Sequence, residues 1–212
     1  PAPGLRLYYV PNPMNDLFSL SIGIPVGTRT EKSLNLAAML FDKSGTKEFS
    51  SEDLQKEWYK LGSSISIGAA DKESSIGLSG LDENFAASLQ LLQSLLRAPQ
   101  APPETLEALK AITLAQREDA QKQVEGIAAA LTQFARYGEE SDFLTRMTSD
   151  EIQAATADQL YAGVQSLLDN PQDITYIGSL PLETVTEALK AFYQGRGSVR
   201  EAPEPAERTV RA

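Results

Sequence analysis

The stretch that decides the fold is Leu34-Asn35-Leu36-Ala37-Ala38-Met39-Leu40-Phe41-Asp42-Lys43-Ser44-Gly45-Thr46. Its spacing predicts a helix from Ser33 to about Lys43, and the Ser44-Gly45-Thr46 sequence stops that helix. The helix is apolar on nearly every side, which is typical of a helix packed inside a protein. We therefore expect it in the core.

Strand and helix signals extend outward from this stretch in both directions. The expected strands span residues 5–10, 17–24, 65–69, 74–79 and 173–178. The further expected helices span residues 51–61, 82–97, 103–123, 127–136, 149–155, 157–168 and 182–193. Strand pairs separated by helix pairs predict an α+β fold, with a mostly antiparallel sheet and helices packed on one face.

The chain of 212 residues is long enough for one large domain. We expect this domain to occupy residues 1–194. From Gly195 onward the sequence becomes rich in glycine, proline and glutamate, so residues 195–212 are predicted to be a linker or tail leading to a further domain.

Composition excludes several kinds of chemistry. The chain contains no histidine and no cysteine, which removes the usual zinc ligands and every Ser-His or Cys-His nucleophile pair. Carboxylate chemistry with a hard cation stays open. A net charge of −10 argues against nucleic acid as a partner, and no apolar run is long enough for a membrane span. The lack of cysteine suits a bacterial periplasm or envelope, with a cytoplasmic location as the alternative.

The order of these elements, together with the turn and loop residues between them, resembles that of the insulinase/pitrilysin/mitochondrial-processing-peptidase family of zinc peptidases over residues 5–193. Each motif alone is weak, and their order and spacing make the match specific. The carriers are Ile24-Pro25-Val26-Gly27-Thr28-Arg29-Thr30-Glu31, Leu40-Phe41-Asp42-Lys43-Ser44-Gly45-Thr46-Lys47, Leu61-Gly62-Ser63-Ser64-Ile65-Ser66, the helix 84–97 with Ala98-Pro99, Arg136-Tyr137-Gly138, Thr148-Ser149-Asp150-Glu151-Ile152 and Tyr176-Ile177-Gly178-Ser179-Leu180.

The resemblance implies a zinc site that this chain lacks. Anchored on Gly45-Thr46, the two histidines of the family's His-x-x-Glu-His motif fall at about Leu36 and Leu40, and the catalytic glutamate falls at about Met39. All three residues are apolar, and we interpret them as core packing. The third zinc ligand falls near Thr113, with Glu118 as a neighbouring alternative. We therefore expect no catalytic residue, metal or cofactor in this chain, and zinc in a partner half.

Other residues carry weaker predictions. Trp58 and Tyr59 are adjacent on a short amphipathic helix, so one faces the core and the other marks a partner interface or only the surface. Ser66, Ile67 and Gly68 match the family strand whose edge pairs with substrate, with plain sheet pairing as the alternative. Arg136-Tyr137 is a candidate contact to a peptide carbonyl, with packing at the end of a helix as the favoured alternative. Arg117-Glu118-Asp119 is interpreted as a solvated helix face.

Two functional hypotheses follow. In the first, the chain is a catalytically silent domain of an insulinase-type metallopeptidase. It walls the chamber and supports the binding of unfolded or short peptides for a zinc-bearing half or subunit, in cis or in trans, and is not an enzyme on its own. In the second, it is a scaffold or peptide-binding protein on the same fold with no associated peptidase. The discriminator is whether a neighbouring half carries His-x-x-Glu-His.

Overall fold

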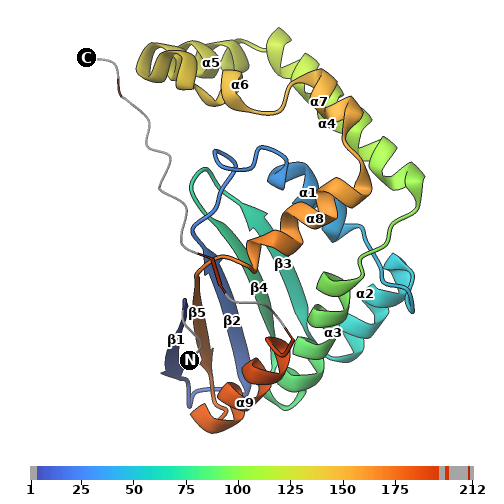
Figure 1. The fold of residues 1–212 in the computed structure, drawn as a ribbon, viewed down its shortest axis with the longest axis vertical. Coiled ribbons are helices and arrows are strands. Elements are labelled where there is room, and N and C mark those ends of the chain that lie inside the picture. The colour runs from blue at the N-terminus through green and yellow to red at the C-terminus, as the bar shows by residue number, and fades with distance from the viewer. Residues whose placement is uncertain (1–3, 196–198, 201–209, 211–212) are drawn as a thin grey trace.

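Five strands form one mixed sheet in the computed structural model, which describes residues 4–195, 199–200 and 210 (Figure 1). Across the sheet the strands lie in the order β1-β5-β2-β4-β3. Their bounds are β1 Leu5–Pro11, β2 Leu17–Ile24, β3 Ser64–Ala69, β4 Ser74–Leu81 and β5 Gln172–Gly178. Only β1 and β5 pair in parallel, so the predicted α+β fold with a mostly antiparallel sheet is confirmed.

The helices agree closely with the sequence-based expectation. Their bounds are α1 Leu34–Asp42, α2 Ser51–Lys60, α3 Phe85–Arg97, α4 Pro103–Lys122, α5 Val124–Tyr137, α6 Asp142–Thr145, α7 Ser149–Ala154, α8 Ala157–Leu167 and α9 Leu182–Phe192, with 3-10 turns η1 Asp82–Asn84 and η2 Gly138–Glu140. The short α6 was not predicted, and α5 begins three residues earlier than expected. Both differences lie between α4 and α7.

Alternating burial along the strands gives the sheet one covered face. In β2 the side chains of Phe18, Leu20, Ile22 and Ile24 are buried, whereas the side chains between them face outward. Figure 1 shows α1, α3, α8 and α9 on one side of the sheet, where these apolar side chains meet the helices. The helix α1 packs into this core through Leu36, Leu40 and Phe41, as predicted, but one of its faces stays exposed.

A buried aromatic cluster joins the sheet to the start of α3. The Phe85 ring packs edge-on against Phe18 at 5.0 Å and against Tyr176 at 5.4 Å between ring centroids. The Tyr176 hydroxyl donates to the buried carboxylate of Asp82 at 3.0 Å, and that carboxylate also accepts from Ser179 N and Oγ at 3.1 and 2.7 Å. Burial raises the pKa of Tyr176. Asp82 therefore ties β5 to η1 and makes no cap to the helix it precedes.

The second half of α4 and the segment that follows it extend away from the sheet as an arm, which we define as residues 112–146 (Figure 1). Buried residues of α4 lie in its first half, at Leu106, Leu109 and Lys110, and α5 has no buried residue. In the described part of the chain, no helix combines the length and apolarity that a membrane span requires.

The predicted tail at residues 195–212 lies mostly outside the described residues. Within it, the Arg200 N–H donates to the Asp169 carbonyl at 2.7 Å, and its guanidinium pairs with the Asp169 carboxylate at 3.3 Å. This described part of the tail contacts the turn that follows α8. The domain boundary after residue 194 stays a prediction.

Candidate functional site

A groove of about 750 Å³ lies between α1, α2 and the edge strand β3, and we call it the edge groove. The lining from β3 and the residue before it spans residues 63–69, and α2 contributes Leu54, Gln55, Trp58 and Tyr59. The residues of α1 that line it include Asn35, Ala38, Met39 and Asp42. Their spacing of three and four residues places them on one face of the helix.

The free edge of β3 opens into this groove. The Ala70 N–H donates to the Glu73 carbonyl at 2.7 Å, which fixes the hydrogen-bonding phase of the β3–β4 hairpin. Because antiparallel pairs alternate between hydrogen-bonded and open, Ser64, Ser66 and Gly68 bond to β4, and the N–H and C=O groups of Ile65, Ile67 and Ala69 point to the free edge. None of the latter groups bonds to another described residue.

Both ends of this free edge are closed by other parts of the chain. At one end, the Ser63 N–H donates to the Trp58 carbonyl at 3.0 Å. At the other end, the Thr28 N–H donates to the Ala70 carbonyl at 2.9 Å, and the Arg29 guanidinium makes a two-pronged contact with the Asp71 carboxylate at 2.9 and 2.6 Å. Between these closures the edge offers about three residues of unpaired backbone.

Gly27 and Gly45 belong to two of the motifs that carry the family resemblance, and each is required because another backbone segment approaches it closely. A side chain at Gly27 would lie 2.5 Å from the carbonyl oxygens of Ala70 and Asp71, so only glycine lets this loop dock on the hairpin. Gly45 exchanges backbone hydrogen bonds of 2.7 and 3.0 Å with Gln100 and leaves no room for a Cβ beside Phe49. These motifs therefore hold the walls of the edge groove in place.

The face of α1 that meets the groove differs from the one inferred from sequence. Leu36 and Leu40 are buried in the core, as core packing predicts, but Met39 is 37% exposed and lines the groove. A His-x-x-Glu-His motif facing the groove would therefore occupy Asn35, Ala38 and Met39. The interpretation of Met39 as a core residue was wrong. Successive residues of a helix are rotated by about 100°, so Met39 faces the groove while its neighbour Leu40 faces the core.

The groove does not have the chemistry of a zinc site. Its α1 face carries an amide, a methyl group and a thioether at the positions just described, and the chain has no histidine or cysteine. No cluster of three acidic residues that could hold a metal occurs among the described residues. The Thr113 hydroxyl donates to the Leu109 carbonyl at 2.7 Å, and Glu118 pairs with Lys122 at 2.6 Å. Neither supplies a third ligand.

The two aromatic residues of α2 separate as expected. Trp58 is 7% exposed and packs in the core, whereas Tyr59 is 87% exposed beside the groove. A role for Tyr59 at a partner interface stays a prediction.

The residues predicted to bind peptide fall at two separate places. Ile67 presents free backbone groups, but the N–H groups of Ser66 and Gly68 point toward β4, and sequence reasoning missed Ile65 and Ala69. The hairpin turn at Asp71-Lys72 carried the signal that fixes this alternation. Arg136 and Tyr137 lie at the end of α5, where the guanidinium sits 5.2 Å from the ring centroid, and the structure does not bring them into the groove.

Comparison with known proteins was made by sequence and by structure. No family model and no curated protein matches the sequence. The structure is similar to the ferredoxin protease FusC, solved in complex with Arabidopsis ferredoxin, with a TM-score of 0.81 and 18% identity over 96% of this chain. It is similar to the periplasmic protease PqqL from Escherichia coli (TM-score 0.80, 13% identity, 95% of this chain) and to a peptidase M16 inactive domain from Pseudomonas fluorescens (0.74, 18%, 97%).

This chain spans 23% of the length of FusC and of PqqL, and 52% of the length of the Pseudomonas fluorescens protein. It therefore has the fold of an insulinase-type peptidase domain. At these levels of identity, the likeness defines the fold.

Proposed function

We propose that this chain is a catalytically silent domain of an insulinase-type zinc peptidase, which walls the chamber and binds peptide for a zinc-bearing half in cis or in trans. The observation that carries the proposal is the edge groove: an open strand edge faces the helix face where a zinc motif would lie, and that face carries no histidine or cysteine and a single carboxylate, Asp42. Binding by strand addition needs only backbone groups, so it does not depend on zinc.

The geometry of the edge groove specifies how a peptide would bind. An extended segment would pair with Ile65, Ile67 and Ala69, and each backbone hydrogen bond would contribute about 1 kcal/mol net. Side chains opposite these residues would point into the groove toward Met39 and Tyr59. The alternate side chains would emerge on the outer face of the sheet. The groove therefore favours peptides with an apolar residue at every second position.

Peptide binding is testable with a labelled, C-terminally amidated hexapeptide that alternates leucine and serine, measured by fluorescence anisotropy. Two N-methylated versions provide the control: one blocks the amides that face β3, and the other blocks the amides on the opposite edge. A bound peptide pairs with β3 through only one of its two backbone edges. We therefore expect one version to lose at least about ten-fold in affinity and the other to retain its affinity. Equal binding by both versions would exclude strand addition.

The association with a zinc-bearing half is tested on the native protein purified from its source. We expect a species well above the mass of the 212-residue chain, or a tightly held second subunit, with about one zinc and a His-x-x-Glu-His half. A native protein of this size without zinc or such a partner would overturn the silent-domain proposal. It would leave a scaffold or peptide-binding protein on the same fold.

We also propose a bacterial envelope location for the intact protein. The lack of cysteine supports it, as does the structural similarity to the periplasmic protease PqqL. Fractionation of the source cells tests this proposal, and recovery in the cytoplasmic fraction would contradict it.

A further inference from the structure

A second concave site lies within the arm, away from the edge groove. The helices α4, α5 and α6, with the residues that flank α6, line a pocket of about 400 Å³, which we call the arm pocket. Its wall is mainly apolar and comes from α5 and α6, through Ile127, Leu131, Phe134, Phe143 and Leu144. The polar members that matter here are Arg117, Ser141 and Arg146.

Two guanidinium groups, those of Arg117 and Arg146, line this pocket. Neither Arg117 nor Arg146 lies within ion-pair distance of a carboxylate among the described residues. Burial lowers the pKa of Arg117, and the positive charge of Arg146 lowers it further. Arg146 lies over the Phe143 ring, 5.0 Å from its centroid. Like charges held together in a partly apolar site favour an anion between them.

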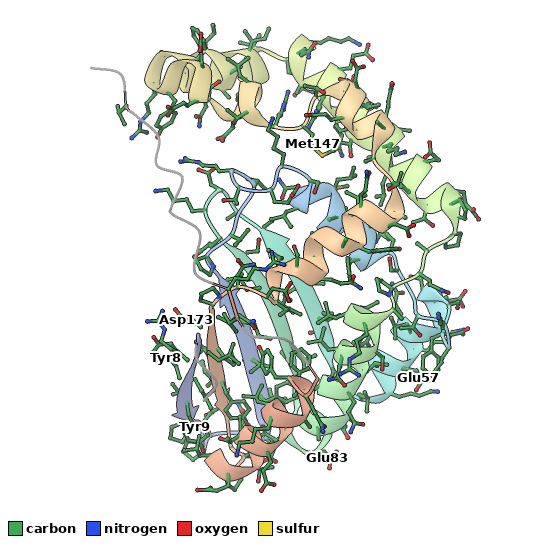
Figure 2. All side chains as sticks on the ribbon, viewed as in Figure 1. Tyr8, Tyr9, Glu57, Glu83, Met147 and Asp173 are labelled. Atoms are coloured by element: carbon green, nitrogen blue, oxygen red, sulfur yellow. The ribbon has the colours of Figure 1, made fainter. Side chains whose placement is uncertain are left out.

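Arg117 is held in place by the body of the protein. Its guanidinium donates to the Met147 carbonyl at 2.6 Å, and the Met147 side chain packs against the core. Figure 2 shows Met147 beneath the arm, on the side toward α1. One N–H group of the Arg117 guanidinium thus anchors the arm, and its remaining N–H groups are available to a ligand.

The third polar group is an unsatisfied hydroxyl. Ser141 is 1% exposed, and its Oγ has no hydrogen-bond partner among the described residues. Buried polar groups are almost always paired, so an orphan donor beside two guanidinium groups calls for an acceptor. A carboxylate oxygen accepts from a hydroxyl and from guanidinium N–H groups at the same time.

We propose that the arm pocket binds a carboxylate carried on an apolar body. Arg117, Arg146 and Ser141 would hold the carboxylate, and the apolar wall of Ile127, Leu131 and Phe134 would contact the apolar body. The volume is within the range of small-molecule sites and accepts a medium-length apolar chain or one to two apolar side chains. Two sources share this chemistry: a free medium-chain carboxylic acid, and the C-terminal carboxylate of a peptide that ends in apolar residues.

The test is calorimetric titration of the full chain with octanoate and, separately, with octanol. We expect saturable binding of octanoate and none of octanol at the same concentration. Arg146→Met should weaken octanoate binding about ten-fold, because it removes a charge-assisted hydrogen bond. The matched control is Lys122→Met, which removes the same charge from an exposed residue of α4 outside the pocket and should change the affinity by less than about two-fold.

Ser141→Ala separates ligand binding from folding. The substitution removes a buried, unpaired hydroxyl, so the melting temperature of the free chain should stay or rise while octanoate binds more weakly. A tripeptide acid ending in leucine and phenylalanine, compared with its C-terminal amide, identifies the source: tighter binding of the peptide acid than of octanoate indicates a peptide terminus, and the reverse indicates a free acid.

Three results would overturn the proposal. They are no saturable binding of either acid, equal binding of octanoate and octanol, and an affinity unchanged by Arg146→Met. Since Ile65, Ile67 and Ala69 lie outside the arm, these results leave peptide binding at the edge groove untouched, and loss of that binding leaves the arm pocket untouched.

Discussion

The orientation of β3 can be tested with proline at two adjacent residues. The Gly68 N–H points toward β4 and bonds to Ser75 opposite, whereas the Ala69 N–H points into the edge groove without a partner. Proline removes the N–H in both cases, and strands tolerate it only where the N–H faces away from the ladder. Gly68→Pro should therefore damage the sheet, and Ala69→Pro should spare it.

The expected difference follows from the bonds each substitution removes. Gly68→Pro loses one ladder hydrogen bond, about 1 kcal/mol, and leaves the Ser75 carbonyl without its donor, for a total of about 2 kcal/mol. Ala69→Pro removes no bond and should cost less than about 1 kcal/mol, partly because proline restricts the unfolded chain. Space is not the cause at Gly68, since an added Cβ would meet only Ser75 Oγ at 3.8 Å.

Urea unfolding followed by Trp58 fluorescence measures both effects. Trp58 is the single tryptophan, lies in the core, and its carbonyl accepts from the residue that precedes β3. Gly68→Ala is the control for adding a side chain and should be nearly neutral. Equal destabilisation by the two prolines, or a larger loss for Ala69→Pro, would refute the hydrogen-bonding phase assigned to β3. The Ala69→Pro protein should also lose the hexapeptide binding described above.

Two further predictions concern the core and the groove face of α1. Tyr176→Phe removes a hydrogen bond to the buried Asp82 carboxylate and should cost about 1.5–3 kcal/mol in urea unfolding at pH 7. Because the folded state raises the pKa of Tyr176, the stability this residue contributes is present below pH 10 and lost as pH rises above it, so the variant should show a shallower alkaline decline. Asn35→His with Met39→His should create a weak two-ligand zinc site measurable by calorimetry. The pair Leu36→His with Leu40→His should instead destabilise the fold, because both residues are buried. Zinc binding by the later pair without loss of stability would contradict the groove face assigned here.

The sequence predicted the elements well because each had a local signal. Apolar spacing and stop residues placed α1, and alternation placed β2, within one or two residues. The place of β5 between β1 and β2 carried no such signal, because β1 and β5 pair across more than 160 residues of sequence. Asp82 illustrates the same limit: it stands at the start of the predicted helix 82–97, where acidic residues often act as caps, but its carboxylate accepts hydrogen bonds from the distant Tyr176 and Ser179.

The candidate sites were less predictable than the fold. Periodicity established that α1 is apolar all round, but it did not show which side stays open, so Met39 was assigned to the core. Arg117 was interpreted as part of a solvated face because it lies in a long helix that was expected to be exposed. Its partial burial depends on the unpredicted α6 and on Met147, thirty residues away. Neither contact leaves a trace in the local pattern of α4.

The two proposed sites rest on different physics, and ionic strength separates them. The edge groove would bind through neutral backbone groups and apolar side chains, which salt affects little. The arm pocket would bind through two guanidinium groups near the surface, where the Debye length falls from about 10 Å at 0.1 M salt to about 3 Å at 1 M. Raising salt should therefore weaken octanoate binding and leave hexapeptide binding nearly unchanged. If salt weakened both equally, charge would contribute to hexapeptide binding as well, which would contradict binding at the edge groove through neutral backbone groups.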